Sequence, residues 1–224
     1  MEIREFVTLK NIFFDFDGTL GDSKELGNFA TQEAFAHFDL TVPSFEQIAY
    51  YMGIPIEQSF IEMADRELLA EEFQALLNEF RWLYKESEKN YLTLFPNAME
   101  MLESLKTKGY KLFVVSSKHS ESLLRNLDTL GIALFFDDVV GSDMVEKYKP
   151  NPESLDLLIK KYELVRDESI MIGDAIFDSQ MGKAASVKTC SVTWGSHSEE
   201  NLRAEKSDFI AHDNQELLKI IISN

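Results

Sequence analysis

The stretch that decides the fold of this 224-residue chain is Ile12-Phe13-Phe14-Asp15-Phe16-Asp17-Gly18-Thr19-Leu20. Its opening residues form a short apolar run, which predicts a buried strand with two aspartates at its end. Side chains alternate along a strand, so Asp15 and Asp17 are expected on the same side. Gly18 permits the tight turn that keeps both carboxylates near one site. Open α/β sheets bind ligands at the carboxyl ends of their strands, so a site is expected here.

Further apolar runs and helical segments alternate along the rest of the chain. Strands are predicted at 12–16, 111–115, 138–140, 169–172 and 187–192. Apolar residues at helical spacing predict helices over 98–105, 123–130 and 155–162, and glycines 109 and 131 follow two of them as helix stops. This alternation predicts an α/β fold: a Rossmann-like core of three layers around a central parallel sheet.

The segment from about Asp22 to Asn90 interrupts this alternation. It is rich in Phe, Glu, Gln and Ala at helical spacing, and no run in it predicts a buried strand. The length of the chain allows one large domain or a core with an insertion. We expect a core domain of residues 1–20 and 92–224 and a small all-helical cap of residues 21–91, with hinges near Gly21 and Leu94-Phe95-Pro96.

Composition narrows the range of partners. The chain is 45% apolar and 27% charged, as soluble globular proteins are, and its formal net charge is −17. That charge disfavours nucleic acid and anionic membrane surfaces and points to a small partner, so no nucleic acid and no membrane are expected. An anionic substrate would then need a divalent cation and local lysines at the site. The chain is expected as a monomer or a homodimer.

The single cysteine and the N-terminus bear on the compartment. Cys190 cannot form an internal disulfide, and its apolar neighbours predict a buried thiol in a reducing compartment. The first residues lack a basic and then apolar leader, and no apolar run reaches the ~18 residues of a membrane span. A cytoplasmic protein is expected.

Three other segments carry candidate chemistry, although each alone is commonly just a loop. A second apolar strand ends in Gly173-Asp174-Ala175-Ile176-Phe177-Asp178, whose carboxylates would complete an oxygen site for Mg²⁺. A third ends in Ser116-Ser117-Lys118, with hydroxyls able to bond a phosphoryl oxygen. In Lys149-Pro150-Asn151-Pro152, prolines on either side of Asn151 stiffen a loop that could hold Lys149 in a fixed pose.

Taken in chain order, the four segments resemble the haloacid dehalogenase-like superfamily, whose motifs are D-x-D-G-T, a strand-end Ser or Thr, a Lys, and G-D-x-x-x-D. The resemblance spans nearly the whole chain. Segments 192–195, 199–202 and 207–210 resemble the phosphoglycolate phosphatase-like branch. The resemblance implies a Mg²⁺-dependent phosphatase of small phosphorylated metabolites that works through an aspartyl-phosphate, with a helical cap closing over its site.

The resemblance also implies roles for individual residues. Asp15 would be the nucleophile, and Asp17 the general acid and then base. Carboxylates of Asp15 and Asp174, with the backbone carbonyl of Asp17, would bind Mg²⁺. Ser116 and Lys149 would hold the phosphoryl oxygens.

Further residues are implied in lesser roles. Asp178 would orient Lys149 or a metal-bound water. Substrate binding would extend to Ser117 and to Met52 and Gly53, in a turn that resembles the cap's specificity loop and is equally typical of a plain helix–helix turn. Thr19 and Gly173 would support the site. Six cap aromatics are expected to pack the cap's own core: Phe29, Phe35, Phe38, Phe60, Phe73 and Trp82.

Three functions remain open at this point. Asp17 argues within the family against dehalogenases and phosphonate hydrolases, and Thr19 favours phosphatases over sugar-phosphate mutases. A phosphatase that hydrolyses small phosphomonoesters is therefore expected first, a mutase resembling β-phosphoglucomutase second. A non-catalytic interaction protein that kept the fold is third, because a binding module needs no such set of residues.

Overall fold

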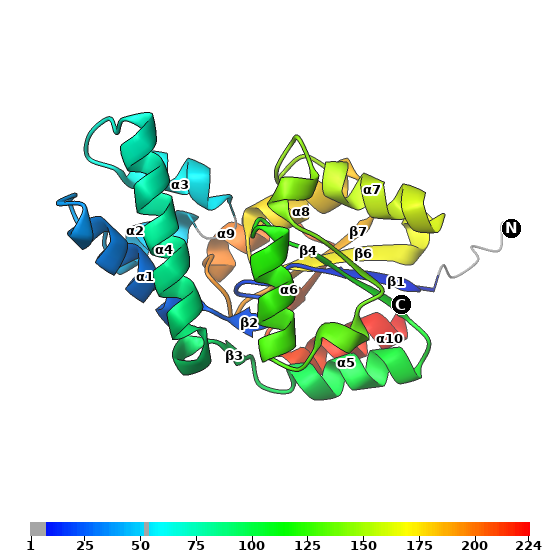
Figure 1. Cartoon of the computed structure of the whole chain (residues 1–224). Helices are drawn as coiled ribbons and strands as arrows, with labels where there is room; N and C mark the ends of the chain where they lie inside the picture. Colours follow the sequence, from blue (N-terminus) through cyan, green and yellow to red (C-terminus); the bar gives the residue numbers. More distant parts are fainter. Residues whose placement is uncertain (1–7, 52–53) are drawn as a thin grey trace, which may run out of the picture.

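The computed structural model describes residues 8–51 and 54–224. Strands and helices alternate through most of the chain, as the sequence predicted (Figure 1). The strands are β1 (Asn11–Phe14), β2 (Gly21–Asp22), β3 (Thr93–Leu94), β4 (Lys111–Val115), β5 (Asp138–Val140), β6 (Ser169–Gly173), β7 (Lys188–Val192) and β8 (Phe209–Ala211). The helices are α1 (Lys24–His37), α2 (Phe45–Tyr51), α3 (Ile56–Met63), α4 (Ala70–Tyr91), α5 (Ala98–Thr107), α6 (Ser120–Thr129), α7 (Glu153–Tyr162), α8 (Ile176–Ala184), α9 (Glu199–Ala204) and α10 (Asn214–Ser223).

A six-stranded sheet with the order β5-β4-β1-β6-β7-β8 forms the centre of the molecule, and all its strand pairs are parallel. This confirms the predicted α/β fold. The edge strand β8 was not predicted as a strand, because three residues, Phe209–Ala211, are too few to show a periodicity. β1 lies between β4 and β6, which places the end of the Ile12–Phe14 run in the middle of the carboxyl edge.

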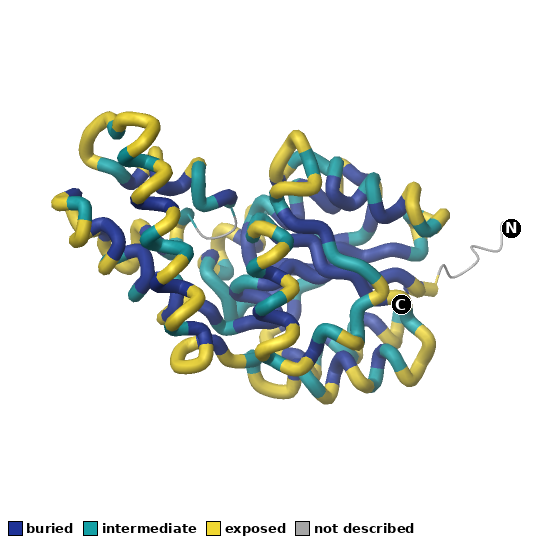
Figure 2. The backbone as a smooth tube through the Cα atoms, viewed as in Figure 1, coloured by how far each residue is buried: buried dark blue, intermediate teal, exposed yellow. Residues whose placement is uncertain are grey.

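Alternation along the strands divides the core between two faces. Phe13 packs with Phe113, Met171 and residues of α7 and α8 on one face. Its neighbours Ile12 and Phe14 pack with residues of α5, α6 and α10 on the other. Both faces of the sheet are thus covered, and helices, sheet and helices form three layers (Figure 2).

Helices α1 to α4 lie beyond the carboxyl edge of the sheet, to one side of the layered core (Figure 1). The chain enters and leaves them through an antiparallel ribbon of β2 and β3, in which Gly21 pairs with Leu94. This ribbon stands at the two positions where hinges were expected. The division into core and cap domains stays a prediction.

Aromatic residues form the centre of this helical segment, with one exception to the prediction. Phe35 and Phe60 are fully buried and meet edge to face, with 5.0 Å between ring centroids. Phe29, Phe38 and Phe73 pack partly buried against the same cluster. The prediction was wrong for Trp82, which is 56% exposed, because it lies on the solvent side of α4.

Other local predictions from the sequence agree with the structure. Gly109 and Gly131 have positive φ angles of 85° and 71° just past α5 and α6, as expected for helix stops. Cys190 is a buried free cysteine, and burial raises the pKa of its thiol to about 12. No helix among the described residues is long and apolar enough to cross a membrane.

A buried ion pair joins the helical segment to the core. The Arg125 guanidinium, on α6, donates through Nε and Nη2 to the carboxylate of Glu88, on α4, at 2.7–3.0 Å. The Glu88 side chain is only 4% exposed. A carboxylate buried this deeply needs its cation, so this pair fixes α4 against α6.

Replacing Arg125 should therefore destabilise the protein. We expect Arg125→Met to lower the free energy of unfolding by roughly 2 kcal/mol. This loss lies between those typical of breaking an exposed ion pair and of breaking a fully buried one. Urea unfolding measures the loss. Lys10→Met removes the cation of a more exposed pair with Glu168 and serves as the control. Equal losses in the two variants would contradict this account.

Candidate active site

Three adjacent strands deliver the predicted site residues to one place. Asp15 follows β1, Ser116 follows β4, and Asp174 follows β6, and these three strands are neighbours in the sheet. The hydrogen bonds Asp15 N to Ile172 O (2.8 Å) and Ser116 N to Val140 O (3.0 Å) continue the parallel ladders past the strand ends. All three side chains are buried. The carboxyl edge of the sheet therefore brings these three predicted residues together.

Lys149 lies between two buried carboxylates. Its Nζ is 2.6 Å from Asp15 Oδ1 and 2.7 Å from Asp178 Oδ1. Burial alone would lower the pKa of Lys149, but Asp15 and Asp178 raise it above its ordinary value, so the side chain stays an ammonium ion. Burial raises the pKa of Asp15 well above its usual range, with repulsion from Asp178 and Asp174 adding to the effect and Lys149 opposing it.

Asp174 stands beside this pair without a cation of its own among the described residues. It accepts hydrogen bonds from Ser196 N (2.6 Å) and Thr19 Oγ1 (3.2 Å). Burial and the nearby Asp178 raise its pKa to about 6. Ligand atoms of Asp15, Asp174 and Asp178 lie within 4.8 Å of one another, and together they could hold a metal ion. Carboxylate oxygens are the donors that hard divalent cations prefer.

The backbone approaches Asp174 closely at two glycines. Gly18 has a φ of +81°, and a Cβ atom at this position would overlap the Asp174 carboxylate. A Cβ atom on Gly195, in the loop after β7, would also overlap the Asp174 carboxylate, and Gly195 was not predicted as a site residue. At Gly173 a Cβ would overlap Asp178 instead. At these three positions only the hydrogen side chain of glycine fits beside the carboxylates.

Asp17 turns away from the carboxylate cluster and bonds to residues that sequence reasoning missed. It accepts from Ser23 Oγ at 2.5 Å and from Lys118 Nζ at 2.9 Å. Lys118 Nζ also contacts the hydroxyl of Tyr84 (2.6 Å), on α4, and Asn126 Oδ1 (2.7 Å). Burial would lower the pKa of Lys118, but Asp17 and Tyr84 raise it. Lys118 thus links Asp17 to the helical segment.

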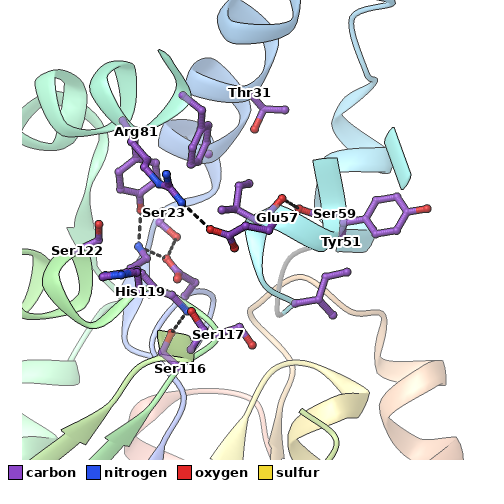
Figure 3. A pocket seen from close by; sticks show the side chains of 18 of the residues that line it. Ser23, Thr31, Tyr51, Glu57, Ser59, Arg81, Ser116, Ser117, His119 and Ser122 are labelled. Carbon is purple, nitrogen blue, oxygen red and sulfur yellow. Dashed lines mark hydrogen bonds and ion pairs between the residues drawn. The ribbon is translucent and has the colours of Figure 1, made fainter. Parts of the chain in front are cut away.

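A cavity of about 150 Å³ opens above Asp15 and Asp17, between the core and helices α1 to α4 (Figure 3). Ser116 and Ser117 line it on the core side. Ser116 Oγ accepts a hydrogen bond from Lys118 N at 3.1 Å. Lys149 and Asp174 are not among the described residues that line the cavity.

The expected specificity turn is only partly described. Met52 and Gly53 lie outside the described residues. Tyr51 and Ile54, on either side of them, line the cavity. Tyr50, which precedes Tyr51 on α2, is 65% exposed and is absent from the described lining.

Comparisons with known proteins identify the family of the chain. Residues 12–192 match the family model of the haloacid dehalogenase-like hydrolases. A phosphoglycolate phosphatase of Vibrio parahaemolyticus is 32% identical, over 95% of this chain and 96% of its own length. A pyrophosphatase PpaX of Bacillus pumilus is 30% identical, over 96% and 97%. The crystal structure of a predicted phosphoglycolate phosphatase from Haemophilus somnus superposes with a TM-score of 0.88 at 27% identity, covering 96% of this chain and 99% of that one.

The chain belongs to the haloacid dehalogenase-like hydrolases. This confirms both the family that the motifs indicated and an enzyme of the hydrolase class. The relatives carry two different substrate names, so the family alone does not decide what this chain hydrolyses.

Removing Lys149 should leave the repulsion between the buried carboxylates uncompensated. We expect Lys149→Met to lower the free energy of unfolding by about 3 kcal/mol at pH 8, because Asp15 and Asp178 lose their buried cation. Burial already raises the pKa of Asp15, and without Lys149 nothing opposes that effect, so the folded variant binds this proton more tightly than its unfolded state does. The loss should therefore shrink as pH falls to 5. Urea unfolding at both pH values checks this, and a loss that grows towards pH 5 would contradict it.

Proposed function

We propose that this chain is a Mg²⁺-dependent phosphatase that hydrolyses small phosphomonoesters through an aspartyl-phosphate on Asp15. The observation that carries the proposal is the placement of Asp15. Its carboxylate is buried, is held at one oxygen by Lys149, lies within the carboxylate cluster, and borders the cavity beside Ser116. A fixed, desolvated carboxylate at the floor of a small pocket is suited to nucleophilic attack.

The first step transfers the phosphoryl group to Asp15. A carboxylate oxygen of Asp15 attacks phosphorus and forms an O–P bond while the bond from phosphorus to the ester oxygen breaks. The leaving oxygen takes a proton from Asp17, which Ser23 and Lys118 hold at the cavity wall. Ser116, with Ser117 beside it, donates to the phosphoryl oxygens. Splitting the displacement in two makes each step easier.

The second step releases phosphate. Asp17, now a carboxylate, takes a proton from water as the water oxygen attacks phosphorus, and the bond to Asp15 breaks. Inorganic phosphate leaves, and Asp15 and Asp17 return to their starting forms. Lys149 keeps the Asp15 carboxylate oriented in both steps, and Asp178 holds Lys149 in place.

The donor set fits a magnesium ion. Carboxylates of Asp15 and Asp174 would hold it with the backbone carbonyl of Asp17, Asp178 would orient Lys149, and Thr19 and Gly173 would shape the surrounding loops. Bound there, the ion neutralises negative charge on the transferring phosphoryl group. It also answers how an anionic substrate approaches a chain of net charge −17.

Several further features belong to the same proposal. Residues 21–91 form a helical cap that closes over a core of residues 1–20 and 92–224, a division supported by the β2–β3 ribbon and the cavity beneath α1 to α4. The enzyme acts in the cytoplasm on a small phosphorylated metabolite. Return of the phosphoryl group to a sugar, as in a mutase, uses the same first step, and only analysis of products separates the two outcomes.

The nucleophile is tested by substitution. We expect Asp15→Asn to reduce phosphate release from a panel of phosphomonoesters by more than about 10³-fold, because an amide of nearly equal volume is a poor nucleophile. Asp156→Asn, on α7 away from the cavity, is the control and should retain activity. Near-normal turnover by Asp15→Asn would place the nucleophile elsewhere. If neither the control nor the wild type releases phosphate, sugar products should be examined next.

Metal binding is tested through stability. The pKa of Asp174, about 6, exceeds the usual carboxyl value of about 4, so the folded metal-free protein binds this proton more tightly than the unfolded chain does. This group therefore adds stability as pH falls from 7 to 5, whereas Mg²⁺ needs the ionised carboxylate. We expect Mg²⁺ to raise the melting temperature by several degrees at pH 7.5 and by little at pH 5. An equal shift at both pH values, or a full shift in Asp174→Asn, would contradict a site at Asp174.

A further inference from the structure

The part of the cavity that would receive the leaving group has a mostly apolar wall. The residues come from the cap helices and the turn between two of them. They are Ile48, Ile54, Ile56, Met63, Phe80 and Tyr84. Burial of an apolar surface of the substrate against such a wall favours binding, whereas burial of a charged group there does not.

The cation on the cap side of the cavity already has a partner. Arg81, on α4, and Glu57, on α3, point toward each other across the cavity, with 2.5 Å between Nη2 and Oε1 (Figure 3). Both residues line the cavity. Their charges cancel, so the pair presents polar atoms to a ligand without a net positive charge.

The cations on the core side are paired in the same way. Among the lining residues that the structure describes, Lys118 bonds to Asp17 and Arg125 to Glu88. His119 Nε2 lies 3.7 Å from Asp143 Oδ2. Every cationic side chain around the described cavity therefore has an acidic side chain within 4.0 Å, while Asp15 and Glu57 also border the space.

This distribution opposes a second negative charge in the substrate. The phosphoryl group of the substrate would contact Asp15, whose carboxylate is held by Lys149 and would also bind the metal. An anionic leaving group would instead approach Glu57, and would have to displace a carboxylate from Arg81 to gain a cation. The Arg81 and Glu57 side chains are 40% and 45% exposed, so solvent weakens this repulsion without removing it.

Uncharged hydroxyls supply the remaining polar contacts. Thr31, Ser59 and Ser122 line the cavity together with the apolar wall. Hydroxyls satisfy a neutral polar group and do not compensate a carboxylate or a phosphate as a cation does. The volume of about 150 Å³ lies below the ~300–1,000 Å³ of drug-sized ligand sites, so the leaving group is compact.

We propose that the site selects phosphomonoesters of compact, uncharged alcohols with an apolar face, such as a single ring or a short chain, and disfavours leaving groups that carry a second anion. This inference rests on the proposed phosphatase function and names its substrate class. Phosphoglycolate and pyrophosphate, whose leaving groups are anionic, fall outside that class.

A matched pair of esters tests the charge preference. Phosphoglycolate and its carboxamide have nearly the same size and differ in the charge of the leaving group. We expect kcat/KM at least roughly tenfold higher for the carboxamide, because a carboxylate here lacks an available charged donor. Benzyl phosphate, whose leaving group is also an aliphatic alcohol, tests the apolar wall, and its kcat/KM should exceed that of the carboxamide. A higher kcat/KM for phosphoglycolate or pyrophosphate would overturn the proposed substrate class, but the proposed phosphatase function would stand.

Removing the negative charge of Glu57 should abolish most of this preference. In Glu57→Gln, Arg81 keeps its place beside the cavity but loses its opposing charge, so the ratio of kcat/KM for phosphoglycolate to that for the carboxamide should rise roughly tenfold. Glu72→Gln removes the same charge from the Arg66–Glu72 pair, whose residues do not appear in the described lining, and should leave the ratio unchanged. Equal ratios in wild type and Glu57→Gln would contradict the role given to this pair.

The two proposals fail in different ways. If no ester in the panel is cleaved with Mg²⁺, the phosphatase function is overturned, and this inference falls with it. If esters are cleaved but the anionic ones are preferred, only the substrate class is wrong. Cleavage of the carboxamide and benzyl esters ahead of the anionic ones supports both.

Discussion

The charge balance around Lys149 is the constraint on which the site depends. One ammonium ion lies between Asp15 and Asp178, and Asp174 stands next to them with raised pKa and no described cation. Three buried carboxylates against one lysine leave an excess of negative charge that a protein interior tolerates poorly. Without a metal, this excess charge lowers the stability of the fold at neutral pH. Binding of a divalent cation would relieve the repulsion, and the same cation would serve the proposed phosphate chemistry.

A second contact connects this centre to the helical segment above it. Lys118 reaches Asp17 and Tyr84 with one ammonium group, and its Nζ also lies 4.5 Å from the centroid of the Tyr84 ring and 5.0 Å from that of Phe16. The Arg125–Glu88 pair joins the same two parts further along α4. The proposed acid and base is thus held by a residue that also contacts α4. If helices α1 to α4 form the proposed cap, its position and the geometry of Asp17 are linked through Lys118.

Much of this arrangement was predictable from short patterns. The parallel sheet follows from apolar runs and helical spacing, and the meeting of Asp15, Ser116 and Asp174 follows because neighbouring parallel strands end at one edge. The partners of Lys118 were not predictable, since Tyr84 reaches it only when a distant helix docks, and no local periodicity encodes that docking. Gly195 was missed for a related reason: its closeness to Asp174 depends on the path of a loop after another strand. Residue type and spacing show which groups can react, but long-range packing decides what holds them.

The most direct test of the central claim is to look for the phosphoryl group on Asp15 during turnover. Protein mixed with Mg²⁺ and a cleaved ester would be quenched in acid within milliseconds, digested, and analysed by mass spectrometry. The account predicts a phosphorylated peptide containing Asp15 that decays as phosphate is released and is missing from Asp15→Asn. Release of phosphate in a burst with no modified peptide, or modification of a different residue, would contradict an aspartyl-phosphate at this site.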